Sequence, residues 1–398
     1  MLKTARELYN STFSEENYQK LKSEIEAEFP GELDFRVAES PVFVSKEFKT
    51  KLLIAANTVI DLIKKDNFKE LTDAAIPLKY RFKDESDHPQ FLCIDFGVCA
   101  NENGELIPEL IELQGFPTLF AFQHYLIGKY KKHGSIDSKL SPFFNRLNGF
   151  NYLHEIEKVI KGETSKNTIL LEAYPEKQRT RIDFKLSQTY WGLDVVCLSK
   201  IFKEDNHLYY HKGDEKIRID RIYNRIIFDE IDRLYRELQS QINILKASDF
   251  EWITNPNWYY RVSKYCLPFL KGTYVPESYF LDKLETLPEK LENFVLKPLY
   301  SFAGAGVDLH PTQEKIEKIE NKSDYLLQRK VQYSPFVISP TGDKSKAEIR
   351  LIYIWPEGAS RPKLVTSLAR LSKGEMINSS KNQDDTWVGG SAVFYEPN

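Results

Sequence analysis

The spacing of apolar side chains changes along the chain, and each change predicts a different kind of element. Residues 47–66 carry apolar side chains at helical intervals and end in lysines, which predicts a packed amphipathic helix. We expect the first ninety residues to be mainly helical. From residue 91 the period becomes two, and the run FLCIDFGVCANENGELIPELIELQ alternates on both sides of Asn103-Gly104, which predicts a β-hairpin.

The second half of the chain mixes strands and helices. Residues 167–174 and 192–199 have the pattern of short buried strands, and residues 181–191 that of a helix between them, which together predict a βαβ unit. Residues 216–248 predict a strand that runs into one long helix. After residue 250 we expect four further strands, at 293–298, 324–331, 347–355 and 363–372. This order predicts an α/β (α+β) fold of about three units.

Composition limits the classes of protein to which the chain can belong. It has 398 residues, of which 41% are hydrophobic and 28% charged, with a formal net charge of −3. No segment approaches the roughly 18 uninterrupted apolar residues of a membrane span, and the charge gives no general attraction to nucleic acid. The N-terminus lacks the pattern of a signal peptide and the four cysteines lack CxxC spacing, so we expect a cytoplasmic protein without structural zinc. A homo-oligomer is compatible with the sequence.

The predicted hairpin carries an acidic pair. With Asn103 and Gly104 as the turn residues, Asp95 faces Glu112 across the hairpin, and like charges at that separation destabilise the pair unless a cation offsets them. Gln114 lies on the same face, so the three oxygen ligands predict a Mg²⁺ site. A half-exposed hairpin with an acidic wet face explains the same residues, and Pro108 can introduce a bulge that shifts the register.

A second candidate site lies in the stretch ENFVLKPLYSFAGAG, residues 292–306. Lys297 shares a strand face with Val295, and a buried ammonium group without an anionic partner is costly. Gly304 and Gly306 allow the backbone to come close to a ligand, which makes phosphate the natural partner. The stretch matches neither a Walker A loop nor a GxGxxG turn, and a plain β-turn is the simpler explanation of the glycines alone.

Further polar residues follow near the C-terminus. Glu348 and Arg350 share one strand face, and Arg370, Lys373 and a glycine-rich stretch at 374–390 come after them. Taken singly, they are explained equally well as a surface ion pair and a surface loop. Their occurrence together with the lysine strand and the acidic hairpin favours a functional site.

These motifs, in this order, resemble the ATP-grasp ligases, specifically the circularly permuted branch that includes glutathione synthetase and glutathionylspermidine synthetase-like proteins. The matching pieces cover roughly residues 90–398 and read CIDFG, IELQG, IDRIYNR, VSKYCLPFL, FVLKPLYSFAGAGV, YLLQRKV, AEIRLIY and ARLSKGE followed by WVGGSA. The resemblance implies an ATP-grasp fold with four parts: a helical segment at 1–90, the hairpin and following helices at 91–165, a βαβ substrate domain at 166–249, and nucleotide-binding subdomains with a glycine-rich lid at 250–398.

The resemblance also implies a reaction, an ATP-dependent joining of a small-molecule carboxylate to an amine through an acylphosphate, with Mg²⁺. It assigns ATP to Lys264, Lys297, Ser301, Gly304, Gly306, Gln328, Arg329, Lys330 and Val331. It assigns the metal to Asp95, Glu112, Gln114 and Glu348, and the substrates to Arg350, Arg370 and Lys373. Two positions depart from the family: Gln114 replaces an asparagine, and the glycine loop lacks an Arg-Glu pair that supplies a metal ligand. A kinase on the same scaffold, a nucleotide-binding protein without catalysis and a non-nucleotide interaction protein are the alternatives.

Overall fold

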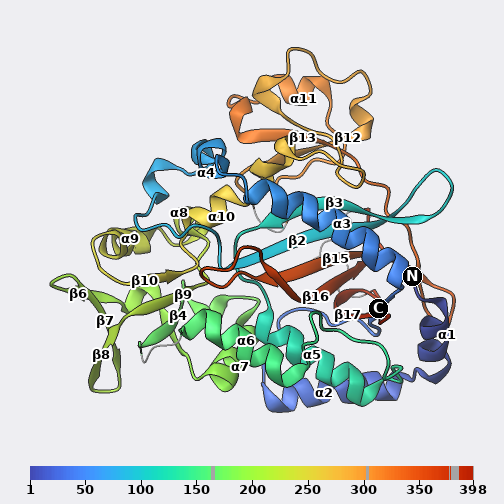
Figure 1. Ribbon diagram of the computed structural model, residues 1–398, viewed down its shortest axis with the longest axis horizontal. Coiled ribbons are helices and arrows are strands. Elements are labelled where there is room, and N and C mark those ends of the chain that lie inside the picture. Colours follow the sequence, from blue (N-terminus) through green and yellow to red (C-terminus); the bar gives the residue numbers. More distant parts are fainter. Residues whose placement is uncertain (163–165, 302–303, 376, 378–384, 398) are drawn as a thin grey trace.

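A computed structural model describes residues 1–162, 166–301, 304–375, 377 and 385–397 of the chain. Four β-sheets and eleven α-helices make up these residues, so the fold class is mixed α/β, as predicted (Figure 1). None of the described helices has the length and the apolar character needed to cross a membrane.

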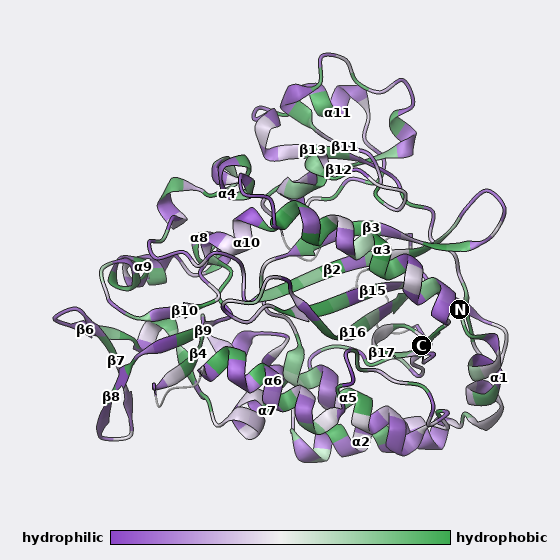
Figure 2. Cartoon of the chain, in the orientation of Figure 1, coloured by the Kyte–Doolittle hydropathy of each residue, from purple (hydrophilic) through white to green (hydrophobic). Residues whose placement is uncertain are grey.

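The largest sheet has seven strands and forms the centre of the molecule (Figure 1). Six of them lie in the order β1 (Val42–Val44), β17 (Gly389–Tyr395), β16 (Lys363–Ser372), β15 (Lys344–Ile354), β2 (Phe91–Ala100) and β3 (Leu106–Gln114), and β14 (Val337–Ile338) pairs with β15. Among the described strands of this sheet, only β1 and β17 pair in parallel. The strand β2 is buried over nearly its whole length, and its apolar residues appear as a green band in Figure 2.

The predicted hairpin forms from β2 and β3, but its turn differs from the prediction. The strands end at Ala100 and Leu106, so the connection is longer than Asn103-Gly104, and the register near it is shifted by one residue. A β-bulge at Ile111 absorbs the shift, because Phe96 pairs with Leu110 whereas Asp95 pairs with Glu112. The predicted Asp95–Glu112 pair is therefore confirmed, although the predicted turn is wrong.

Helices cover the large sheet and complete its core. Four of them gather below it in Figure 1: α2 (Glu15–Glu28), α5 (Phe120–His133), α6 (Gly149–Lys161) and α7 (Arg181–Trp191). On the other side α3 (Lys46–Ile63), the predicted amphipathic helix, packs on β3. Side chains of α1 (Lys3–Thr12), α2, α3 and β1 belong to the same apolar core as the central strands, whereas Ala75, Ile76, Tyr80 and Phe82 belong to the core of a second sheet.

The predicted βαβ unit is confirmed as part of a four-stranded parallel sheet, in the order β10 (Glu251–Ile253), β9 (Arg221–Asn224), β4 (Thr168–Glu172) and β5 (Asp194–Cys197). The helix α7 connects β4 to β5. A meander of β6 (Phe202–Glu204), β7 (His207–Lys212) and β8 (Glu215–Ile219) projects from this sheet at the left of Figure 1. The sequence pattern did not predict β6 and β7.

The predicted long helix after β9 is wrong. The segment forms two short helices, α8 (Phe228–Leu234) and α9 (Gln239–Lys246), separated by a 3₁₀ turn at Arg236–Leu238. Tyr235 has φ −137° and ψ 47°, outside the helical region, and its ring packs on Tyr174 with the ring centres 5.0 Å apart. The helix thus breaks at Tyr235, where the ring makes a tertiary contact. The spacing of apolar residues in the sequence did not predict this break.

A small third sheet lies above the large one in Figure 1 and consists of β11 (Ser278–Phe280), β13 (Tyr325–Arg329) and β12 (Phe294–Pro298). It has an apolar core of its own, to which β12 contributes Phe294 and Leu296. Period-two alternation therefore turns Val295 and Lys297 to the opposite face of β12. The helix α11 (Gln313–Glu317) completes this unit, and two short helices, α4 (Phe68–Leu71) and α10 (Asn257–Arg261), lie nearer the parallel sheet.

The fold buries a carboxyl group at the end of β4, and this group should make stability depend on pH. Burial raises the pKa of Glu172 to about 8, and its carboxyl accepts a hydrogen bond from the backbone N–H of Ala173 at 2.8 Å. An unfolded glutamate has a pKa of about 4.3. The folded chain therefore holds a proton that the unfolded chain has lost between these values, and stability falls as pH rises through this window.

We predict that Glu172→Gln removes this dependence, because glutamine keeps the accepting oxygen and cannot ionise. Urea unfolding at pH 5.5 and pH 8 should show that the wild type loses up to about 1.4 kcal/mol per pH unit relative to the variant. Equal changes in the two proteins would contradict the assignment.

Candidate functional site

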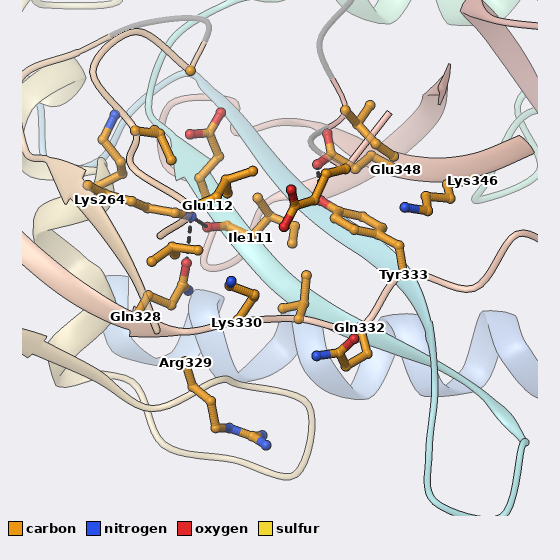
Figure 3. Close-up of a pocket in the computed structure, with 18 of the residues that line it drawn as sticks. Ile111, Glu112, Lys264, Gln328, Arg329, Lys330, Gln332, Tyr333, Lys346 and Glu348 are labelled. Atoms are coloured by element: carbon orange, nitrogen blue, oxygen red, sulfur yellow. Dashed lines mark hydrogen bonds between the residues drawn. The ribbon is translucent and has the colours of Figure 1, made fainter. Parts of the chain in front are cut away.

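A pocket of about 210 Å³ lies between the small sheet and the large one (Figure 3). The strand β12 and the end of β13 form one side, and β3, β15 and β16 form the other. Figure 3 shows Glu112, Lys264 and Gln328 near one end, and Tyr333, Lys346 and Glu348 near the other.

The pocket is rich in positive charge. Six cationic and three acidic side chains line it: Lys264, Lys297, Arg329, Lys330, Lys346 and Arg370, with Glu112, Glu348 and Glu375. The rest of its wall is largely apolar and includes Val295, Val307, Leu309, Val331 and Ile377. A pocket of this composition suits a ligand with an apolar part and several negative charges.

Lys297 is one of two deeply buried cations in the pocket, with 8% of its surface exposed, against 7% for Lys264. Its ammonium donates to the side-chain oxygen of Gln328 at 2.5 Å and to the backbone oxygen of Ile111 at 3.2 Å. Burial lowers the pKa of Lys297 to about 8, and the negative charge of Glu112 partly offsets the effect. Two neutral acceptors hold this cation, so an anion in the pocket would stabilise it further.

The β-bulge in β3 supplies one of these acceptors. Ile111 is the extra residue between the paired Leu110 and Glu112, and its carbonyl accepts from Lys297. The side-chain amide of Gln328 donates to the carbonyl of Leu110 at 3.4 Å. The bulge thus brings Leu110 and Ile111 of the large sheet into contact with Gln328 and Lys297 of the small sheet beside the pocket. β-Bulges are common next to active sites.

Lys264 lies at the start of a 3₁₀ helix, Lys264–Phe269. Its ammonium donates to the backbone oxygen of Ser301 at 2.5 Å and to the Ser301 hydroxyl at 3.1 Å. Burial lowers the pKa of Lys264, and Glu112 acts in the opposite direction. Lys264 therefore fixes the segment that follows β12 beside the pocket.

The glycines after β12 adopt left-handed backbone conformations. Gly304 has φ +75° and lines the pocket, and Gly306 has φ +72°. A Cβ atom at Gly306 would lie 2.8 Å from Cγ of Pro298, so a side chain there would be both strained and crowded. The first half of the predicted phosphate loop, residues 302–303, lies outside the described residues, as do residues 376 and 378–384 of the predicted lid.

Four of the residues assigned to ATP lie together at the end of β13. Gln328, Arg329, Lys330 and Val331 all line the pocket. The backbone N–H groups of Arg329 and Lys330 donate to the backbone carbonyls of Glu277 at 2.8 Å and of Asn293 at 2.7 Å, respectively. Arg329 extends away from the other labelled side chains in Figure 3, and its guanidinium lies 3.6 Å from Glu109.

The acidic hairpin is neutralised differently from the prediction. Asp95 is 1% exposed, and both of its oxygens accept from Arg350 at 2.6 Å. Arg370 donates to the same carboxylate at 2.7 Å. Burial alone would raise the pKa of Asp95, but the two arginines outweigh it and lower the pKa. The charge that offsets the Asp95–Glu112 pair therefore comes from arginine, because Arg350 of β15 pairs with Asp95 in register.

The other predicted metal ligands differ in availability. Glu112 lines the pocket with 24% of its side chain exposed, and its nearest cationic atom is Arg350 Nη2 at 3.9 Å. Glu348 accepts from the Tyr333 hydroxyl and pairs with Arg370 at 2.9 Å, and burial raises its pKa. Gln114 lines a small adjoining recess. Within the described ranges no group of three or more Asp, Glu, His and Cys residues is placed to hold a metal ion.

The three residues predicted to bind substrates are also spread out. Arg370 lines the pocket, whereas Arg350 lies beneath it against Asp95 and donates to the Thr118 hydroxyl at 3.2 Å. Lys373 lies outside the pocket wall, with its ammonium 3.5 Å from the Thr386 hydroxyl.

Sequence reasoning missed several lining residues, among them Lys346, Tyr333 and Glu375. Lys346 had a readable signal, because it lies two residues before Glu348 and so on the same strand face. Tyr333 had no readable signal in the sequence, because its place depends on a contact between distant segments. Its ring lies over Gly97, where a Cβ atom would be 2.8 Å from the Tyr333 ring.

A solved structure resembles the whole described architecture. It is a glutathione synthetase-like effector from Globodera pallida in its apo form, which matches 91% of this chain and 90% of that chain with a TM-score of 0.56. The sequence identity is 10%, so the likeness shows the fold alone. This chain has a glutathione synthetase-like fold. Neither a protein-family model nor a curated protein matches the sequence.

We predict that Asp95→Asn is strongly destabilising, because it leaves the buried guanidinium of Arg350 without its close carboxylate and removes one of the two carboxylates that pair with Arg370. Loss of one partner from a buried ion pair costs about 3–5 kcal/mol. Glu112→Gln is the matched control, since Glu112 is partly exposed and lacks a close ion pair. Urea unfolding of both variants checks this, and equal small losses would contradict the role given to Asp95.

Proposed function

We propose that this protein is an ATP-dependent carboxylate–amine ligase that forms an amide or peptide bond. The observation that carries the proposal is the pair of buried lysines, Lys264 and Lys297, which face one pocket lined by a left-handed glycine and by the end of β13. The ATP-grasp assignment rests on this arrangement together with the order of the motifs. The glutathione synthetase-like fold is consistent with it.

The residues fit a nucleoside triphosphate. In this proposal the base packs against the apolar wall near Val331 and Leu309, and Lys264 and Lys297 neutralise the phosphates. The carbonyl of Ile111 and the Gln328 side chain keep Lys297 aimed at the pocket. Such fixed charges stabilise phosphoryl transfer mainly by position and electrostatics.

The residues also fit a magnesium ion that the nucleotide itself largely coordinates. Mg²⁺ in such sites usually binds one or two carboxylates together with phosphate oxygens and water. Among the predicted metal ligands, Glu112 is the open carboxylate in the pocket, and Glu348 becomes a second ligand only if it gives up contacts to Arg370 and Tyr333. When bound, the ion would supply charge neutralisation at the phosphates. We therefore assign Glu112 as the principal protein ligand.

The proposed reaction has two transfers. A substrate carboxylate oxygen forms a bond to the γ-phosphorus as the bond to the β,γ-bridging oxygen breaks, which releases ADP. The amine nitrogen then bonds to the acyl carbon, phosphate leaves, and the amine loses a proton to solvent. Arg370 lines the pocket, and its guanidinium is placed to orient the carboxylate.

Binding and turnover of ATP test this function, with Lys297→Met as the key variant. Methionine keeps the length of the side chain but removes the charge, so we expect a stable protein that no longer responds to the nucleotide. Mg-ATP at 100-fold above its Kd should stabilise the wild type by about 2.7 kcal/mol. Lys318→Met, a change at an exposed lysine of the same subdomain, is the matched control and should behave as the wild type does.

Turnover is measured as ADP release with a panel of carboxylate and amine pairs, followed by product analysis. An amide together with ADP supports the ligase, and a phosphoester would instead indicate a kinase. ATP binding without ADP release across the panel would indicate a nucleotide-binding protein. Failure of Mg-ATP to stabilise the wild type would contradict the nucleotide site altogether.

A further inference from the structure

Trp387 has an unusual backbone conformation just before β17. Its φ is +60°, and the residue is 5% exposed. Left-handed backbone is uncommon and unfavourable for a bulky residue, so it persists only where surrounding contacts enforce it. The contacts that hold Trp387 therefore indicate what the fold is built to position.

The N-terminal segment supplies most of those contacts. The backbone N–H of Trp387 donates to the carboxylate of Glu39 at 2.7 Å. The indole ring packs against Phe13 with ring centres 5.3 Å apart, and the guanidinium of Arg6 lies 5.8 Å from the ring centre. The carbonyl of Trp387 accepts from the Ser345 hydroxyl of β15 at 2.8 Å.

The next residues are held just as closely. Arg36 donates from its side chain to the carbonyl of Val388 at 3.1 Å, and its own carbonyl accepts from the N–H of Gly390 at 2.8 Å. Gly389 has φ +120°, and a Cβ atom there would lie 2.4 Å from the Arg36 carbonyl oxygen. Residues 36–39 therefore pack so closely against the start of β17 that there is no room for a side chain at Gly389.

Glu39 links Arg36 of the N-terminal segment to Trp387 at the start of β17. It is 3% exposed, pairs with the guanidinium of Arg36 and accepts from Trp387. A buried carboxylate is costly unless it is paired and hydrogen-bonded. Both of its interactions lie at the junction between the N-terminal segment and β17, so this is where the free energy of burying Glu39 is recovered.

The junction lies directly behind the pocket. Lys346 and Glu348 of β15 line the pocket, so Ser345, one residue away, points to the opposite face of the sheet. Trp387 is bonded to Ser345 on that opposite face, whereas Glu375 and Ile377 line the pocket. Ile377 and Trp387 therefore lie on opposite faces of the large sheet.

The same junction sets the neighbour of a pocket arginine. Gly390 pairs with Arg370 across β16 and β17, and Gly389 pairs with Leu371. A shift of β17 would move the strand that carries Arg370, and with it the residues that follow at the pocket.

We propose that Glu39 is a positioning residue for the pocket. It holds Trp387 in its left-handed conformation, and thereby fixes the start of β17, which pairs with the strand that carries the pocket residue Arg370. This gives the N-terminal segment a role in ligand binding at a site that it does not line. The inference rests on the proposed nucleotide site, because Mg-ATP is the ligand used to test it.

The test compares Glu39→Ala with Glu39→Gln in the full-length protein. Alanine removes the acceptor for the Trp387 N–H, and we expect nucleotide affinity, measured by calorimetry, to fall about five- to tenfold. Glutamine keeps an accepting oxygen and should restore most of the affinity. Amide hydrogen exchange of residues 385–390 should rise in the alanine variant and much less in the glutamine variant.

Ile25→Ala is the control, because Ile25 is buried in α2 of the same N-terminal segment and makes no contact with Trp387 among those described. It should lower the melting temperature without changing nucleotide affinity. If Glu39→Ala does not fold, Ser345→Ala, which releases the Trp387 carbonyl, should weaken affinity in the same direction. Equal affinity of the wild type and of the Glu39 or Ser345 variants would overturn the inference, whereas absence of nucleotide binding to the wild type would overturn the proposed function instead.

Discussion

The burial of one ammonium group between two sheets is the constraint on which the site depends. Lys297 comes from the small sheet, and one of its two acceptors, the Ile111 carbonyl, belongs to the large sheet. The bulge in β3 makes that carbonyl available. Because neither acceptor carries a charge, the interaction holds the two sheets together and still leaves the cation in need of an anion. In the proposed function, Lys297 is thus both a structural contact between the sheets and an anion-binding group.

Beneath the pocket, charged residues on neighbouring strands of the large sheet pair with each other. Asp95 of β2 meets Arg350 of β15, and Glu348 of β15 meets Arg370 of β16, each in register. Arg370 also pairs with Asp95, so the Asp95–Arg350 pair and the Glu348–Arg370 pair form one network. Buried charges are tolerated when they are paired and hydrogen-bonded, and here pairing leaves Glu112 as the acid of these strands that is open to the pocket. In the proposed function, the strand register therefore decides which of these acids is available for the metal.

The alternation of side chains could predict much of this structure, because it reports local backbone form. The pattern predicted the hairpin, the βαβ unit and the strand that carries Lys297, and the structure has strands at these positions. It could not predict that Arg350 pairs with Asp95, because 255 residues separate them and the contact depends on which strands become neighbours. The contact of Glu39 with Trp387 depends in the same way on the parallel pairing of β1 with β17. The break at Tyr235 was hidden because the residues on both sides of it favour helix.

The central claim is that Lys297 and Lys264 are held in place for the phosphates of a nucleotide. A crystal structure of the protein with Mg²⁺ and a non-hydrolysable ATP analogue tests it most directly. We predict phosphate oxygens within hydrogen-bonding distance of both ammonium groups, the metal on Glu112, and the base against Val331. An analogue bound elsewhere, with Lys297 still bonded only to Gln328 and Ile111, would contradict the account.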